Sequence, residues 1–227
     1  MSTQGIAAFA DAASAYESWF QTPLGSYVDR LERAALERLL EGTPAVQVVE
    51  IGAGTGHVVI WLEALGHRVT AVEPSAAMRA QGIARGRDIV ARWVDARAEQ
   101  LPFATGSFDG AIMFTALEFV AEPVRAIEQA LRVIQPDGWL CVGYLNALSS
   151  WAAAYRRYGE RGKQPWAGAR FFVREDLEQM VGRTADRSES AVRLSPAATA
   201  PFAAADAAGE RAGNAAAMEV LLWRLIR

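Results

Sequence analysis

Short β-branched runs alternate with stretches of helical periodicity from Gly42 onward. The strands predicted from these runs are residues 46–51, 68–73, 89–94, 108–114 and 138–144. This alternation is typical of a parallel sheet whose strands are joined by crossover helices. The run at 108–114 is apolar at successive positions, so we expect it to be a central strand covered on both faces.

Helices are predicted between the strands and at both ends of the chain. Their ranges are 27–40, 58–65, 75–82, 123–134 and 174–180. Ser75 is a suitable N-cap, and Pro123 is suited to a first helical turn. Two final strands are predicted near 191–194 and 218–226. The Ala-, Pro- and Gly-rich residues 196–217 between them are interpreted as a connection.

The bulk composition indicates a folded chain that does not bind nucleic acid. Its 227 residues are 52% hydrophobic with a net charge of −3, which favours one domain, residues 1–227, and gives no basic surface for phosphates. Cys141 lies in an apolar run and is expected to be buried. Residues 1–20 lack a basic start before an apolar run, and no stretch approaches the roughly 20 apolar residues of a membrane span. We therefore expect no membrane insertion and a cytoplasmic location.

A glycine-rich turn, EIGAGTGH at residues 50–57, follows the first predicted strand and leads into a helix. Glycines at this place let the chain turn sharply and let a ligand approach the main chain. A dinucleotide-binding turn needs the spacing G-x-G-x-x-G, but the third glycine here comes one residue too soon. A phosphate-binding loop would need a following Gly-Lys-Ser/Thr, which is missing. The glycines alone also leave open a tight turn without a ligand.

The pattern Glu-x-Gly-x-Gly-x-Gly resembles motif I of the class I S-adenosylmethionine-dependent methyltransferases. Further segments resemble that family in the same order, namely residues 71–75, 94–103, 107–111, 114–120 and 131–140. Residues 16–25 are similar to the lid helix of the subgroup related to the ubiquinone and menaquinone biosynthesis methyltransferases. The resemblance covers roughly residues 14–145 and weakens after Tyr144.

The resemblance implies a doubly wound, Rossmann-like α/β fold. Its seven-stranded sheet would be mostly parallel with an antiparallel last strand, an N-terminal helical lid and a cap inserted after strand five. The single domain would divide into a lid, a cofactor-binding core, an acceptor cap, and a C-terminal helix with strands. These parts correspond to residues 1–41, 42–145, 146–172 and 173–227.

The resemblance also implies S-adenosyl-L-methionine as cofactor. Glu73 would accept hydrogen bonds from the ribose hydroxyls, and Asp95 and Ala96 would read the adenine edge. The residues expected to bind the cofactor are Tyr16, Trp19, Glu50, Gly52, Ala53, Gly54, Gly56, Glu73, Pro74, Met78, Asp95, Ala96 and Thr115. Tyr16 and Trp19 could equally pack without closing over it.

Methyl transfer is an in-line displacement, so alignment of the reactants and exclusion of water can replace a dedicated base. Glu118 and His57 are the weak candidates for proton transfer. Glu118 follows the fourth strand closely, but a structural carboxylate is the alternative. His57 could instead start the helix after the glycine turn. His67 follows a helix-ending glycine and is predicted to be a surface turn residue.

The cap combines aromatic and basic side chains. Tyr144, Trp151, Tyr155 and Trp166 are the candidates for contact with the acceptor. Rings and arginines together could enclose an apolar or aromatic acceptor that bears an anionic group. The alternative is an amphipathic helix with its aromatics in the core and a solvated basic face.

The function expected from these features is methylation of a small molecule by an enzyme. The alternative is an S-adenosylmethionine-binding accessory or regulatory protein without turnover. A nicotinamide dehydrogenase is disfavoured by the glycine spacing. No His/Cys/Asp cluster has the spacing of metal ligands, so no metal is expected. The sequence does not indicate an oligomeric state.

Overall fold

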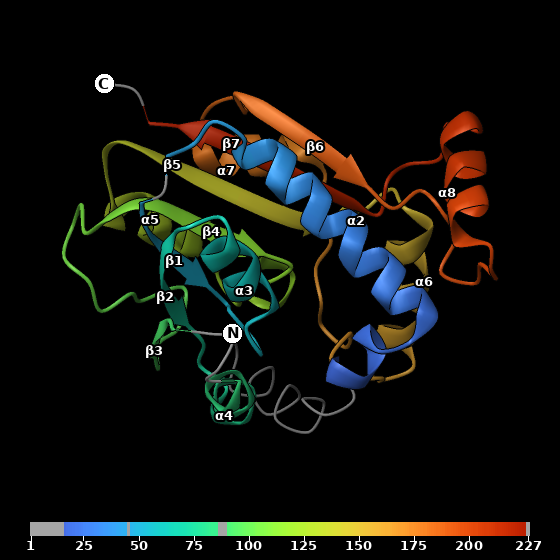
Figure 1. The fold of residues 1–227 in the computed structure, drawn as a ribbon, viewed down its shortest axis with the longest axis horizontal. Helices are drawn as coiled ribbons and strands as arrows, with labels where there is room; N and C mark the ends of the chain where they lie inside the picture. The colour runs from blue at the N-terminus through green and yellow to red at the C-terminus, as the bar shows by residue number, and fades with distance from the viewer. Residues whose placement is uncertain (1–15, 45, 86–89, 226–227) are drawn as a thin grey trace.

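A mixed sheet of seven strands organises the chain (Figure 1). The computed structural model describes residues 16–44, 46–85 and 90–225. The strands are β1 Gln47–Ile51, β2 Arg68–Val72, β3 Arg92–Val94, β4 Phe108–Phe114, β5 Ile134–Leu145, β6 Arg187–Ala191 and β7 Met218–Arg224. Their order is β3-β2-β1-β4-β5-β7-β6. Strand β7 runs antiparallel to both of its neighbours, β5 and β6, and the other neighbouring strands pair in parallel. This confirms the predicted doubly wound sheet.

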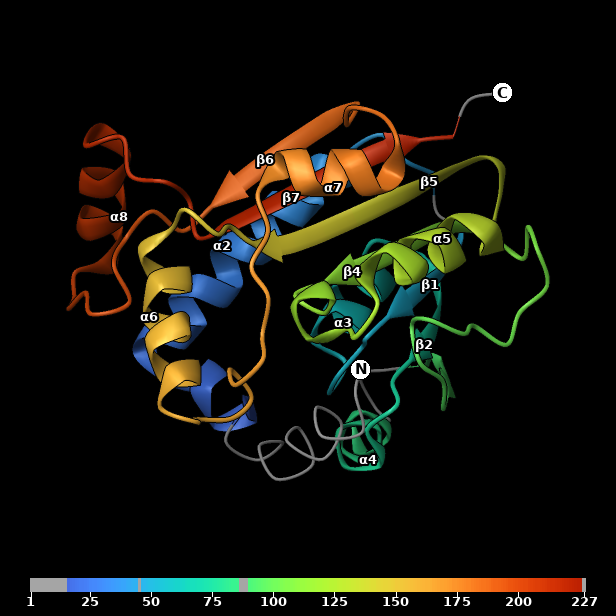
Figure 2. The same ribbon diagram turned by 180° about the vertical axis from the view of Figure 1, so that it is seen from behind.

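Helices cover both faces of the sheet. They are α2 Pro23–Leu40, α3 His57–Ala64, α4 Ala76–Ala84, α5 Pro123–Val133, α6 Ser150–Glu160, α7 Arg174–Val181 and α8 Phe202–Arg211, with a 3₁₀ turn, η1, at Leu117–Phe119. Helices α2 and α3 lie on one face, and α5 and α7 lie on the other, as the two opposite views show (Figures 1 and 2). Residues 16–20, which we call the lid segment, are helical as well.

Successive side chains along each strand point to opposite faces of the sheet, so the core has two layers. Val48 belongs to the layer beneath α2 and α3, whereas Val49 and Ile51 belong to the layer beneath α5 and α7. All residues of β4 except Asp109 are buried, as the continuous apolar run predicted. Cys141 is likewise buried, which confirms its expected place in the core.

The strand order reverses between β1 and β4. The chain passes from β1 through β2 to β3 in one direction and returns to place β4 on the other side of β1. In open α/β sheets, ligands bind at the carboxyl ends of the strands beside such a reversal. The glycine-rich turn lies there, directly after β1.

Two predicted elements and the predicted exposure of one histidine differ from the structure. The strand predicted at 191–194 is instead β6, which ends at Ala191 and pairs with β7. Residues 202–211 form α8, where a connection had been predicted. His67 is only 5% exposed, accepts a hydrogen bond from the Val46 amide at 3.3 Å and packs against Trp139, so its prediction as a surface residue was wrong.

In the part of the chain that the structure describes, no helix has the length and apolar character needed to span a membrane.

Candidate functional site

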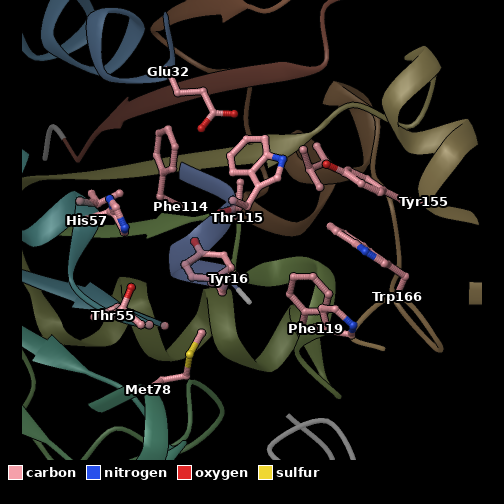
Figure 3. A pocket seen from close by; sticks show the side chains of 18 of the residues that line it. Tyr16, Glu32, Thr55, His57, Met78, Phe114, Thr115, Phe119, Tyr155 and Trp166 are labelled. Atoms are coloured by element: carbon pink, nitrogen blue, oxygen red, sulfur yellow. The ribbon is translucent and has the colours of Figure 1, made fainter. Parts of the chain in front are cut away.

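A cavity of about 490 Å³ lies at the carboxyl ends of β1, β2 and β4 (Figure 3). Its walls come from three parts of the chain that are distant in sequence. The glycine-rich turn and the ends of the strands form one wall. The lid segment and α2 form a second, and α6 with the loop after it forms the third. We refer to residues 146–172 as the cap.

The glycine-rich turn needs glycine for two different reasons. Gly52, Gly54 and Gly56 have φ angles of 83°, 55° and 86°, a region that other residues rarely adopt. A Cβ atom on Gly52 would lie 2.5 Å from the Cβ of Ala116, so close packing excludes a side chain there. At Gly54, a Cβ would meet only the Met78 methyl group at 3.8 Å. Gly54 therefore leaves space open toward the cavity.

Glu73 connects the turn to the start of α4. Its carboxylate accepts hydrogen bonds from the amides of Gly54, at 2.9 Å, and Ser75, at 2.7 Å. The side chain is 3% exposed. Burial raises its pKa, and the two backbone hydrogen bonds oppose that rise. Each carboxylate oxygen retains capacity for another donor, so Glu73 could accept a pair of ligand hydroxyl groups.

Glu50 presents a carboxylate oxygen without a partner. Glu50 is 2% exposed, and its Oε2 has no hydrogen-bond partner among the described residues. Burial, and secondarily the nearby Glu73, raises the pKa of Glu50 well above 4.5. An unpaired buried carboxylate is energetically costly. A ligand group that is cationic or donates hydrogen bonds would relieve this cost.

Aromatic rings form the opposite end of the cavity. Tyr155 stacks on Trp166 with ring centroids 3.6 Å apart and an angle of 6° between the planes, and Phe119 lies 5.7 Å from Trp166. Trp19 of the lid segment contacts Trp151 of α6 edge to face. The lid and the cap therefore meet through aromatic contacts above the ends of the strands.

Comparisons with known proteins agree with this arrangement. Residues 49–142 match the family described as methyltransferase domain. The structure superposes with a TM-score of 0.76 on a Thermotoga maritima protein described as a SAM-dependent methyltransferase, possible histamine N-methyltransferase. That alignment covers 96% of this chain and 98% of the other at 25% identity. Residues 49–142 therefore carry a methyltransferase domain.

Two curated relatives extend the comparison. An uncharacterized protein of Mycobacterium tuberculosis is 33% identical over 169 residues, which are 74% of this chain and 56% of that protein. A demethylmenaquinone methyltransferase of Beutenbergia cavernae is 34% identical over 132 residues, 58% of this chain and 54% of the relative. The chain thus spans little more than half the length of these relatives. The family match and the fold imply S-adenosyl-L-methionine as cofactor, as the resemblance of the sequence motifs implied.

Most residues predicted to form the site of this methyltransferase domain do line the cavity. From the cofactor set these are Tyr16, Trp19, Glu50, Gly52, Ala53, Gly54, Glu73, Pro74, Met78 and Thr115, and from the remaining candidates His57, Trp151, Tyr155 and Trp166. Thr115 has a φ of 47°, which gives the turn after β4 a left-handed residue beside the cavity. Gly56 does not line the cavity and instead precedes α3 as its N-cap.

Asp95 and Ala96 do not reach the cavity of the methyltransferase domain. Asp95 is exposed and forms an ion pair with Arg79 at 2.8 Å. Three residues after Asp95, Ala98 is buried and lines the wall instead. Asp95 and Ala96 therefore lie outside the cavity lining, and their contact with the ligand stays a prediction.

Tyr144 and Glu118 are structural. Tyr144 is fully buried and donates a hydrogen bond from its hydroxyl to Glu219 at 2.7 Å, away from the cavity. Glu118 is fully buried, accepts a hydrogen bond from the Leu145 amide at 2.6 Å and does not line the cavity. This carboxylate joins η1 to the end of β5. Neither residue lines the cavity.

His57 lines the cavity but is engaged by the lid segment. Its Nε2 lies 3.1 Å from Glu17, and its ring stacks on Phe20 with centroids 3.9 Å apart. Glu17 also accepts a hydrogen bond from Thr55 and pairs with Arg85. Burial lowers the pKa of His57, which favours its neutral form. This network attaches the lid segment to the glycine-rich turn of the methyltransferase domain.

Sequence reasoning missed Glu32. This residue of α2 is half-buried and lines the cavity, and burial raises its pKa to about 8. It lies one helical turn from both Val28 and Leu36, which are buried. A carboxylate between two buried positions on the same helical face was the signal that could have identified it.

Proposed function

We propose that this chain transfers a methyl group from S-adenosylmethionine to a small-molecule acceptor held in the same cavity. The observation that supports this most strongly is the continuity of the cavity. Its lining runs from the glycine-rich turn at one end to the aromatic rings of the lid and cap at the other. A protein that only bound the cofactor would not need this second end, so the accessory alternative is disfavoured.

The residues of the core fit S-adenosylmethionine by their chemistry. The open main chain at Gly54 would face the amino-acid part, and the unpaired oxygen of Glu50 would attract its positive charge. Glu73 would hold the ribose hydroxyls, and Met78 would cover an apolar face of the nucleoside. S-adenosylmethionine supplies a methyl group made electrophilic by its positively charged sulfur.

The remaining walls would exclude water and orient the acceptor. Rings of the lid segment and the cap enclose the second end of the cavity, and a dry, fixed geometry favours direct displacement. The named relatives suggest different acceptors. One is a demethylmenaquinone methyltransferase, and the solved structure is described as a possible histamine N-methyltransferase. Aromatic walls are compatible with either acceptor.

Calorimetric titration with S-adenosylmethionine, S-adenosylhomocysteine and NAD tests the cofactor class. We expect the two sulfur nucleosides to bind and NAD not to bind. Gly54→Val should weaken nucleoside binding by at least roughly tenfold, about 1.4 kcal/mol, because its side chain would project into the cavity.

Gly42→Val is the matched control for Gly54→Val. Gly42 also has a positive φ, 77°, with no atom near its Cβ direction, and it lies outside the cavity. This variant carries the backbone strain without the steric block and should keep wild-type affinity. Equal affinity in the two variants would contradict the placement of the cofactor. Nucleoside binding without formation of S-adenosylhomocysteine from any acceptor pool would favour the accessory alternative.

A further inference from the structure

We propose that the acceptor is a protonated amine, recognised by the Glu32 carboxylate within the aromatic end of the cavity. This inference rests on the proposed methyl transfer and names the chemical class of its acceptor. The described residues that line the cavity include side chains of both charges. They comprise the carboxylates Glu32, Glu50 and Glu73 and the basic side chains Lys163 and His57.

The basic groups near the cavity already have partners within the protein. The Lys163 ammonium lies 4.7 Å from the centre of the Tyr158 ring. Arg156 lies over Phe171 and donates a hydrogen bond to the Ala147 carbonyl, and Arg170 donates to the Val120 carbonyl; neither lines the cavity. The anionic acceptor expected from the arginines of the cap is therefore not supported.

Glu32, in contrast, has no hydrogen bond or ion pair with any residue in the described ranges. Figure 3 shows its carboxylate directed from α2 into the cavity, on the side where the aromatic rings gather. Glu50 and Glu73 lie beside the glycine-rich turn, where both carboxylates would bind the cofactor. Glu32 is thus the carboxylate left for a second ligand.

The surroundings of Glu32 suit an organic cation. Tyr16, Tyr155 and Trp166 line the same cavity, and Tyr155 and Trp166 stack to present a flat aromatic wall. Aromatic faces attract ammonium groups through their negative π surfaces. A carboxylate then accepts charge-assisted hydrogen bonds from an ammonium group, which are stronger than those that a neutral hydroxyl group donates.

Glu32 can also hold the proton that an amine must lose before it is methylated. In the protein alone, burial raises the pKa of Glu32 to about 8, and Asp29 of α2 and Glu118 of η1 add to the rise. A bound ammonium group opposes this rise, so the carboxylate is ionised in the complex and can accept the ammonium proton. The phenols of Tyr16 and Tyr155 face the same region, and burial raises their pKa values as well. The ammonium proton would pass to Glu32, and the freed nitrogen lone pair would form the N–C bond. The C–S bond would break with its electron pair on sulfur.

Three probes of matched shape test the charge preference: 2-phenylethylamine, 2-phenylethanol and 3-phenylpropanoate. Each is titrated calorimetrically into the wild-type protein, both free and saturated with S-adenosylhomocysteine. We expect the amine to bind at least tenfold more tightly than the alcohol or the acid. Equal affinities, or a preference for the acid, would overturn the proposal even if S-adenosylhomocysteine binds normally.

Glu32→Gln and Glu37→Gln form the matched pair of variants. Glu37 lies on the same helix but pairs with Arg33 on the outer side, away from the cavity. Glu32→Gln should remove the preference for the amine while S-adenosylhomocysteine affinity stays within twofold, and Glu37→Gln should preserve both. An unchanged amine preference in folded Glu32→Gln would overturn the role of Glu32. Failure of S-adenosylhomocysteine to bind the wild type would instead count against the proposed methyl transfer, while the titrations of the free protein still decide the amine preference.

Discussion

Several carboxylates are buried around the carboxyl ends of the central strands. Glu50 and Glu73 lie beside the glycine-rich turn, and Glu118 lies fully buried behind the turn after β4. Glu118 satisfies the Leu145 amide through one oxygen, while its other oxygen has no partner among the described residues. Burial raises the pKa of Glu118 to about 7. This residue therefore makes the free energy of unfolding depend on pH near neutrality.

Glu118→Gln is expected to flatten the pH dependence of stability. The folded pKa of about 7 lies above the ordinary value of 4.5, so the folded chain keeps a proton that the unfolded chain releases. Stability from this group is complete below pH 4.5 and is lost as the pH rises through about 7. Thermal unfolding between pH 4.5 and pH 8.5 should show a fall in Tm that is smaller in the variant. A difference of about 1 kcal/mol corresponds to roughly 2–4 °C for a chain of this length.

Glu122→Gln is the control for this measurement. Glu122 precedes α5, close to η1, but its side chain is exposed. Its substitution should leave the wild-type pH dependence unchanged. Equal pH dependence of unfolding in Glu118→Gln and the wild type would mean that Glu118 does not hold its proton in the folded state.

Single residues were predictable where a local pattern determines their position. Gly52, Gly54, Glu73 and Ser75 follow directly from the order of strand, turn and helix. The first three line the cavity, and Ser75 is the N-cap of α4. Asp95 could not be placed in the same way, because its exposure depends on the path of the chain after β3 and on Arg79. Glu32 was missed because the cavity that it faces is formed by segments distant in sequence.

At the level of elements, the lid segment is attached to the core by polar contacts. Glu17 accepts a hydrogen bond from Thr55 within the glycine-rich turn and also contacts His57 and Arg85. Phe20, one turn further along, stacks on the ring of His57. Because these contacts end on the turn itself, movement of the lid segment and access to the cofactor end of the cavity are physically connected.

Glu17→Gln is expected to accelerate release of bound S-adenosylhomocysteine. The substitution removes the charge that pairs with Arg85 and weakens the hydrogen bond from Thr55. A loss of about 1.4 kcal/mol, close to the lower end of the usual range for hydrogen bonds to charged groups, corresponds to roughly tenfold faster release. Stopped-flow displacement measures this rate. Glu128→Gln, on the exposed side of α5, should release the ligand at the wild-type rate. Equal rates in all three proteins would show that the lid segment does not control release.

Elements with a strong hydrophobic period were predicted well, and those defined by tertiary contacts were not. The prediction for β4 matches the structure because its apolar run is continuous. In α8, by contrast, Phe202 packs on Tyr27 of α2, and Asp206 accepts a hydrogen bond from the Leu194 amide at 3.0 Å. These long-range partners support a helix in a segment whose own sequence is rich in alanine without a clear stripe. The exposed and polar positions of β6 similarly gave no strand signal.

The molecule as a whole joins the two ends of the cavity above the topological reversal of its sheet. The cofactor end is built from contiguous motifs between β1 and α4, which explains why the sequence predicted it. The aromatic end, where we propose that the acceptor binds, is formed jointly by the lid segment, α2, α6 and the loop after α6. Its composition was visible in the aromatic and basic residues of the cap. The charge at this end of the cavity could not be predicted from the cap sequence, because Arg156 and Arg170 donate hydrogen bonds to backbone carbonyls outside the cavity.

Trp166→Ala should distinguish the two ends of the cavity by changing acceptor use without changing cofactor affinity. Trp166 lines the cavity, stacks on Tyr155 and contacts Phe119, and it lies on the loop after α6, far in sequence from the glycine-rich turn. Affinity for S-adenosylhomocysteine should stay within twofold in calorimetry. The kcat/KM for an acceptor that the wild type methylates should fall by roughly tenfold, about 1.4 kcal/mol of lost transition-state stabilisation. Trp166→Phe retains an aromatic face and should recover most of this loss.

The choice of Trp166 over Trp151 follows from their different environments. Trp151 is buried and donates a hydrogen bond from its indole nitrogen to the Leu194 carbonyl at 2.8 Å, so its truncation would cost roughly 3–5 kcal/mol of stability. Trp166 is half-buried, and its removal leaves the core beneath it intact. If Trp166→Ala weakened S-adenosylhomocysteine binding as much as acceptor use, the aromatic end would serve the cofactor, and the division of the cavity into two ends would be wrong.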